Sequence, residues 1–252
     1  MMNKFSIAIH GGAGTLVKGM MTTSKEAAYK ASLEASINAG YEILQNGGSA
    51  VDAVEKAVTV LEDSPLFNAG KGSVFTADGT HEMDASIMDG SNKEAGAVGL
   101  ISGIKNPIQL ARKVMDNSEH VFLGGDGAMK FAKSQNVKTE DEAYFFDQLR
   151  YDQWQEIKDT DSFQLDHSKS KDHKFGTVGA VALDQNGNVA AATSTGGMTN
   201  KRFGRIGDSP MIGSGNYANN KTCAVSCTGS GEFFIRGVVA YEVSALIEFK
   251  GC

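Results

Sequence analysis

The chain has 252 residues, of which 41% are hydrophobic and 21% are charged, and its formal net charge is −6. This length and composition predict one large globular domain with a sizeable core. The negative charge, without any basic cluster, disfavours nucleic acid and anionic membrane surfaces as partners, and no apolar run approaches the length of a membrane span.

The three cysteines, Cys223, Cys227 and Cys252, show no spacing typical of a disulfide framework. An odd number of cysteines favours free thiols and a reducing compartment, so we expect a cytoplasmic protein. Small apolar core positions are the preferred interpretation of these residues.

The first half of the chain predicts alternating strands and helices. We place strands at about residues 5–9, 95–101 and 120–123, and helices at about residues 24–45, from 49 to before 65, and from 107 onwards. Apolar residues recur at intervals of three and four in the helices. Ser49 and Asp52 form a variant of the capping box, and Asn106-Pro107 provides a cap and a first-turn proline. Residues 66–90 are rich in glycine and mixed in character, without an assigned element.

The second half begins with a charged segment at residues 159–176, which we expect to be a mobile linker because it has too few large apolar residues to order itself. Strands at about 177–183 and 188–195 follow, and Asn-Gly between them is a strong hairpin signal. A strand at 223–227 then leads into one helix at about 232–248. This order favours a layered α/β protein with an antiparallel or mixed sheet.

The glycine loop at residues 10–14 follows the first strand, as a phosphate-binding loop would. It lacks both the G-x-G-x-x-G spacing and a terminal Gly-Lys-Ser/Thr, so a structural turn is preferred and a nucleotide-binding module stays an alternative. The five histidines show no metal-ligand spacing, and we expect no catalytic metal or other catalytic cofactor.

Thr177 lies where the polar segment ends and an apolar run begins, and Gly176 precedes it. A threonine at the start of a buried strand can reach the peptide bond before it. Cleavage of that bond would give Thr177 a free α-amino group beside its hydroxyl, and a hydroxyl activated by its own amine is a known type of nucleophile.

Two further hydroxyl residues lie at predicted strand ends, Thr195 and Thr228. Threonine favours strands in general, so either position alone has an ordinary structural explanation. Glycine follows both residues. A bare backbone N–H beside a hydroxyl suits an oxyanion hole, which makes a shared site at these strand ends a reasonable hypothesis.

Arg205 and Asp208 lie close together in a glycine-containing segment, and alone they could form a surface ion pair of little energetic value. Within a site, the arginine fork would hold a carboxylate and the aspartate would hold an ammonium group. Together they would form a clamp for the α-carboxylate and α-ammonium groups of a free amino acid.

These residues and their surroundings resemble the plant-type L-asparaginase/isoaspartyl peptidase family of N-terminal-nucleophile hydrolases. The matching segments are residues 9–14, 65–70, 82–90, 176–184, 192–200, 204–210 and 226–232. The resemblance spans essentially the whole chain, and motifs of this length in this order are very specific.

The resemblance implies an α/β (α+β) fold built as a four-layer αββα sandwich, in a single domain over residues 1–252. It implies autocleavage between Gly176 and Thr177 into an α-subunit, 1–176, and a β-subunit, 177–252. A dimer of these cleaved αβ units is the implied assembly.

The implied chemistry is hydrolysis of β-aspartyl amide bonds in L-asparagine and isoaspartyl peptides. The implied site residues are, for catalysis, Thr177, Thr195, Thr228 and Gly229 and, for substrate binding, Arg205, Asp208, Gly231 and Asn68. Thr177 would be the nucleophile with Thr195 as its support, and Thr228 with Gly229 would form the oxyanion hole. The sequence does not rank the two substrates, because the amino acid clamp reads the part that they share.

A loop that follows the second helix resembles the sodium-binding loop of the family. Its implied ligands are the backbone carbonyls of Leu61, Glu62, Ser64, Phe67, Ala69 and Lys71. A structural sodium ion, without a role in catalysis, is therefore expected there.

Members of the family continue past the position that matches Cys252 with a glycine-rich segment and further strands. The sequence therefore predicts that part of the usual second sheet is missing, as in a chain truncated at its C-terminus. Two alternatives stay open: an amidase of the glycosylasparaginase type, and an inactive binding or interaction protein.

Overall fold

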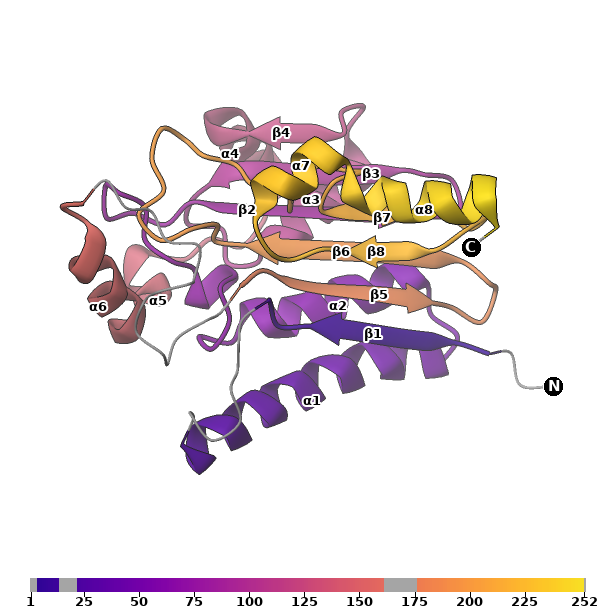
Figure 1. The fold of residues 1–252 in the computed structure, drawn as a ribbon, viewed down its shortest axis with the longest axis horizontal. Coiled ribbons are helices and arrows are strands. Elements are labelled where there is room, and N and C mark those ends of the chain that lie inside the picture. Colours follow the sequence, from indigo (N-terminus) through magenta and orange to yellow (C-terminus); the bar gives the residue numbers. More distant parts are fainter. Residues whose placement is uncertain (1–3, 14–21, 161–175, 252) are drawn as a thin grey trace.

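The structure is a computed structural model, and it describes residues 4–13, 22–160 and 176–251. Its centre is a mixed sheet of six strands among these residues (Figure 1). In spatial order the strands are β1 (Ser6–His10), β5 (Val178–Leu183), β6 (Val189–Thr195), β2 (Met83–Asp89), β3 (Ala95–Ile101) and β4 (Phe122–Gly124). All neighbours are antiparallel except β3 and β4, which are parallel. The expectation of an α/β protein with a mixed sheet is confirmed.

Three helices cover one face of this sheet: α1 (Thr23–Gln45), α2 (Ala50–Glu62) and α3 (Pro107–Asn117). Val51, Val54, Val58 and Leu61 recur along α2 and are all buried. Each buried aliphatic side chain contributes about 1.5–3 kcal/mol to the free energy of unfolding. The hydrophobic stripe predicted for this helix is therefore the one that packs on the sheet.

The opposite face carries a two-stranded sheet of β7 (Asn216–Ala218) and β8 (Ala224–Ser226), which contacts β6. Helix α8 (Val239–Lys250) contacts this small sheet from outside, and Figure 1 shows it in yellow in front of the strands. Strand β6 is thus covered on both faces, which explains its continuous run Ala190–Ala192 with every alanine buried.

Three helices follow the parallel strand β4: α4 (Gly125–Ser134), α5 (Glu142–Phe145) and α6 (Gln148–Ile157). Sequence reasoning assigned none of them. It also missed β2 and β7, because strand β2 lies within a stretch rich in glycine and β7 has only three residues. Strand β4 lies one to two residues later than predicted.

The single helix predicted at about 232–248 is wrong. Two helices occupy this range, α7 (Gly231–Gly237) and α8, because Val238 adopts the left-handed conformation with φ 48° and ψ 45°. The helical spacing of Ile235, Val239, Val243 and Leu246 predicts one apolar face for a single helix, and that prediction is wrong at Val243. Val243 is exposed, whereas Ala240 and Ser244 are buried against the small sheet, since small side chains allow a close approach.

The predicted linker falls almost entirely on residues 161–175, outside the described residues. Among the described residues, no helix combines the length and apolar character that a membrane crossing requires. Cys223 and Cys227 are both free thiols, as predicted, with Cys227 buried and Cys223 half-buried.

Candidate active site

Thr177 lies immediately before β5, where the β5–β6 hairpin brings it opposite the end of β6. Val178 pairs with Ser194 in the register of this hairpin. The Thr177 hydroxyl donates a hydrogen bond to Thr195 Oγ1 at 3.0 Å, and its oxygen lies 3.4 Å from Ser209 Oγ. Two of the predicted hydroxyl residues therefore meet through strand register alone.

Thr195 is held by the glycine turn that follows it. Its Oγ1 also accepts a hydrogen bond from the Gly197 backbone N–H at 3.0 Å. Asn68 fixes this turn, because its Nδ2 donates to the Gly197 carbonyl at 2.7 Å and its Oδ1 accepts from the Val74 N–H at 3.1 Å. The buried Asn68 amide thus lines the cavity and supports the turn, and its role in substrate binding stays a prediction.

Thr228 and Gly229 reach the site from the segment between β8 and α7. Thr228 Oγ1 accepts a hydrogen bond from the Ala13 N–H at 3.0 Å, which leaves its own proton available to another acceptor. Gly229 has φ +149°, and a Cβ there would lie 2.7 Å from the Phe234 ring. Only glycine suits this position.

The glycine loop after β1 contacts the junction before Thr177. Gly12 has φ +111°, and a Cβ there would lie 2.5 Å from the Gly176 backbone nitrogen. The loop therefore needs glycine because another backbone segment passes against it. This contact agrees with the structural interpretation of the loop, and the loop carries part of the site.

His10 lies beneath this junction in a partly buried hydrogen-bond network. Its Nε2 lies 2.9 Å from Ser226 Oγ, which is 2.6 Å from Thr193 Oγ1. Burial lowers the pKa of the His10 imidazole to about 4, so the ring is neutral near pH 7. Its place behind the strand ends makes it a support rather than a metal ligand.

Arg205 and Asp208 lie on the opposite side of the same cavity, and Gly231 lies between them. A Cβ on Gly231 would come within 2.8 Å of Asp208 Oδ1 and 3.0 Å of the Arg205 guanidinium. The Arg205 side chain is engaged by Glu232, with Nε 2.9 Å and Nη2 2.8 Å from Glu232 Oε1. Gly231 therefore provides the space in which both charged groups converge.

The Asp208 carboxylate is placed to bind a cation. Its Oδ2 is buried and has no hydrogen-bond partner among the described residues. Burial raises the pKa of Asp208 to about 6, and nearby Arg205 opposes this rise. A buried carboxylate oxygen without a partner is costly, and a substrate ammonium group would satisfy it.

One cavity brings together nearly all the predicted residues. It is lined by Ala13, Asn68, Gly176, Thr177, Thr195, Gly197, Met198, Arg205, Gly207, Asp208, Ser209, Thr228 and Gly229. Gly231 adjoins it through the clamp. Sequence reasoning missed Ala13, Gly197, Met198, Gly207 and Ser209 as lining residues, although each lies in or directly beside a motif that it had singled out.

The predicted sodium loop lies at the end of α2 and carries Asn68 into the cavity. Leu61 and Glu62 are the last residues of the helix. Ser64, Phe67 and Ala69 follow in the turn that leads to η1 (Gly70–Gly72), and Lys71 lies within η1. A Cβ on Gly70 would lie 2.5 Å from the Glu62 carbonyl oxygen, and one on Gly72 would lie 2.1 Å from the Phe67 carbonyl oxygen. The loop thus folds tightly back on its own carbonyls. No group of His, Cys, Asp or Glu side chains suited to a metal occurs in the described part of the chain.

Hydroxyl groups and an Arg–Asp pair converge on one cavity, and similarity to known proteins places the chain among the hydrolases. The family model described as asparaginase matches residues 3–252, so the chain belongs to the asparaginase family.

Curated relatives agree with this assignment. An isoaspartyl peptidase of Escherichia coli (strain K12) is 49% identical over 253 residues, which cover 99% of this chain and 79% of that protein. An isoaspartyl peptidase/L-asparaginase of Xenopus laevis is 46% identical over 235 residues, covering 93% of this chain and 73% of that protein. A protein of the same name from Danio rerio is 45% identical, covering 91% of this chain and 72% of the relative.

Proposed function

We propose that this protein hydrolyses β-aspartyl amide bonds, as an isoaspartyl peptidase and L-asparaginase. The observation that carries the proposal is the single cavity that holds Thr177 beside Thr195 and faces the Arg205–Asp208 clamp. The printed names of the relatives give the same activity, and they match over nearly the whole chain.

We propose that the chain first cleaves itself between Gly176 and Thr177. The Thr177 hydroxyl attacks the Gly176 carbonyl carbon, the amide is exchanged for an ester, and water hydrolyses that ester. The products are an α-subunit of residues 1–176 and a β-subunit of residues 177–252 that begins with a free amine. The close contact between Gly12 and Gly176 supports this step, because it holds the scissile segment against the glycine loop.

The mature site then acts on substrate. The Thr177 α-amine takes the proton of its own hydroxyl, and the oxygen attacks the side-chain carbonyl of the substrate. The leaving amine departs with a proton, and water releases aspartate from the resulting β-aspartyl ester. The Thr228 hydroxyl and the Gly229 N–H stabilise the oxyanion, and one such donor is typically worth about 10²–10³ in kcat.

The clamp selects a free amino acid end. Arg205 binds the α-carboxylate through its planar fork, and Asp208 with its unpartnered Oδ2 binds the α-ammonium. When substrate enters, Arg205 must either release Glu232 or bind Glu232 and the substrate carboxylate together. Asparagine and isoaspartyl peptides carry the same α-groups, so both fit this clamp.

Several family properties belong to the proposal. We infer that the helices, the six-stranded sheet, the β7–β8 sheet and α8 correspond to the layers of an αββα sandwich. We also infer a cytoplasmic enzyme that assembles as a dimer of cleaved units. Two free thiols without disulfide geometry support the reducing location.

A sodium ion is proposed for the loop at residues 61–71. The tight return of the chain at Gly70 and Gly72 brings the carbonyls of Glu62 and Phe67 to one turn, which suits a hard cation with oxygen ligands. The ion would stabilise the loop that carries Asn68. Replacing sodium with tetramethylammonium should lower the melting temperature, and an unchanged value would contradict the site.

Three measurements test the main proposal. N-terminal sequencing should find a chain that begins at Thr177, and denaturing electrophoresis should show two bands. The protein should release aspartate from β-aspartyl dipeptides and asparagine. A single persistent band without turnover would favour an inactive binding protein, and turnover restricted to glycosylated asparagine would favour the glycosylasparaginase type.

A further inference from the structure

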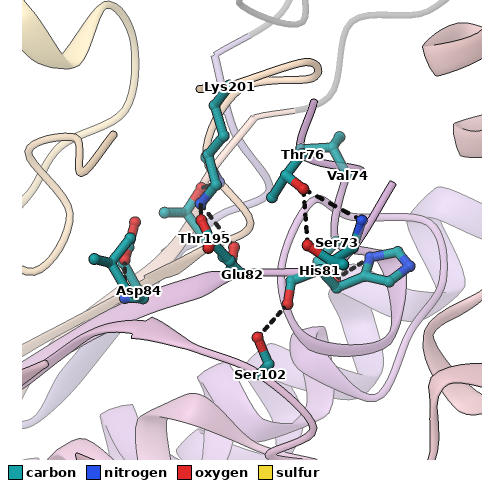
Figure 2. A network of polar contacts seen from close by, with 12 residues as sticks. Ser73, Val74, Thr76, His81, Glu82, Asp84, Ser102, Thr195 and Lys201 are labelled. Atoms are coloured by element: carbon teal, nitrogen blue, oxygen red, sulfur yellow. Dashed lines mark hydrogen bonds and ion pairs between the residues drawn. The ribbon is translucent and has the colours of Figure 1, made fainter. Parts of the chain in front are cut away.

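Lys201 is a buried lysine beside the glycine turn that follows Thr195. The proposed mechanism does not use this lysine. Only 3% of the residue is exposed. Its Nζ donates a hydrogen bond to the Glu82 carbonyl at 2.8 Å and lies 3.9 Å from Glu82 Oε2 (Figure 2). A buried ammonium group is costly unless it is paired and hydrogen-bonded, so its retention here needs an explanation.

Asp84 provides the second carboxyl group near this lysine; burial raises its pKa, and the Lys201 charge opposes that rise. It is fully buried in β2 and pairs in register with Thr195 across the β2–β6 ladder. Its Oδ1 accepts a hydrogen bond from the Leu100 N–H at 2.9 Å, whereas its Oδ2 has no hydrogen-bond partner among the described residues. Burial lowers the pKa of Lys201, and Asp84 and then Glu82 oppose that change. Lysine and aspartate therefore form a buried charge cluster behind Thr195.

Short contacts connect Lys201 with the nucleophile. A Cβ on Gly197 would lie 3.2 Å from both Cδ and Nζ of Lys201, so this side chain packs directly against the turn. The Gly197 N–H donates to Thr195 Oγ1, and Thr195 Oγ1 accepts the hydroxyl of Thr177. The Lys201 backbone is itself fixed, because its carbonyl accepts from the Ala77 N–H at 2.9 Å.

We propose that Lys201 is a positioning residue for the reaction: its side chain supports the turn at Gly197, and its charge keeps the α-amine of cleaved Thr177 neutral. This inference rests on the proposed function, in which that amine is the base. A positive charge in a poorly solvated site disfavours a second positive charge nearby, and an amine must be neutral to accept a proton.

The other charged groups around Thr177 are already compensated. Arg205 is paired with Glu232, and Asp208 receives the substrate ammonium. The His10 imidazole is neutral because burial lowers its pKa to about 4. Glu62, whose Oε1 accepts a hydrogen bond from Ser194 Oγ at 2.6 Å, is protonated near pH 7 because burial raises its pKa to about 8. Within the described part of the chain, Lys201, Asp84 and Glu82 are therefore the groups to which we assign the field at the amine.

The test uses the full chain and measures kcat against pH with a β-aspartyl dipeptide. Turnover is normalised to the amount of mature Thr177 N-terminus, determined by mass spectrometry. Lys201→Met keeps an unbranched side chain that is one heavy atom shorter and removes its charge. We expect kcat to fall at least about tenfold at pH 7 and the acidic limb of the kcat profile to move about one unit to higher pH. KM should change little, because the Arg205–Asp208 clamp is not altered.

Asp84→Asn is the matched variant, since it keeps the lysine and removes the opposing charge. Its acidic limb should move to lower pH, and Glu82→Gln at a half-buried position should shift it in the same direction. Damage to packing would not produce shifts of opposite sign. If Lys201→Met does not fold, these two variants decide the question.

The role of Lys201 would be overturned if the acidic limb of the kcat–pH profile were unchanged in the variants. It would also be overturned if the limb moved in the same direction in all three variants. That outcome is distinct from failure of the proposed function. In the latter case the wild-type protein itself would not release aspartate from the dipeptide.

Discussion

The two sides of the cavity are built in different ways. The nucleophile side consists of Thr177 and Thr195 at the ends of adjacent strands, and the register of the β5–β6 hairpin sets their separation of 3.0 Å. The clamp side consists of Arg205 and Asp208 on a long loop, with Arg205 bound to Glu232 on α7. Backbone ladders position the first pair, whereas charges and glycine spacing position the second.

This difference indicates which parts of the site can tolerate substitution. Strand ends hold side chains without help from a ligand, so a changed residue there should remove a catalytic function outright. Charged groups on a loop retain alternative partners, so changes there should alter affinity and pH dependence gradually. The following predictions test this contrast.

Thr177→Ala should have the largest effect. Without the hydroxyl neither self-cleavage nor attack on substrate can occur, so the chain should stay intact and aspartate release should fall to background. Electrophoresis and an aspartate assay would measure both outcomes. Ser134→Ala removes a distant hydroxyl at the end of α4 and should behave as the wild type. Cleavage in Thr177→Ala at the wild-type position would contradict the assigned nucleophile.

Gly12→Ala should block or strongly slow maturation. The new Cβ would lie 2.5 Å from the Gly176 nitrogen, and φ +111° is unfavourable for alanine. The time course of band conversion would show the defect. Gly47→Ala is the control, because Gly47 also has a positive φ, +80°, but nothing lies within 4 Å of its added Cβ. Equal maturation of Gly12→Ala and the wild type would show that this contact is unimportant.

Asp208 should make kcat/KM dependent on pH. Burial raises its pKa to about 6, so the free enzyme loses the carboxylate charge as the pH falls through 6. Binding of the substrate ammonium, and with it kcat/KM, should then decline. Asp208→Asn should lower kcat/KM about 10- to 100-fold, since a hydrogen bond to a charged group is worth about 1.5–3 kcal/mol. It should also remove the dependence near pH 6. If Asp208→Asn still shows the decline in kcat/KM near pH 6, another group must cause that decline.

Glu232→Gln should have the smallest effect. Its bond to Arg205 is partly exposed, and pairs of this kind contribute little to stability. The uncharged glutamine should release Arg205 more readily to a substrate carboxylate, so KM should fall no more than a few-fold with kcat unchanged. A large loss of kcat would mean that Glu232 positions Arg205 instead of competing with substrate.

The sequence alone determined the elements with strong local signals. Residues 23–45 and 50–62 form helices because apolar side chains recur at helical spacing, and Asn186-Gly187 joins the two strands of a hairpin. Glycine beside a hydroxyl pointed to Thr177, Thr195 and Thr228, and these signals are local because they depend on neighbouring residues.

Tertiary structure decided the rest, since the relevant contacts join distant segments. Val238 breaks the predicted C-terminal helix, and the two helices that it separates expose Val243 while they bury Ala240. Gly12 requires glycine only because Gly176 passes against it. Lys201 looks like an ordinary surface residue in the sequence. Only the tertiary structure shows that its charged group is buried between Glu82 and the glycine turn after Thr195.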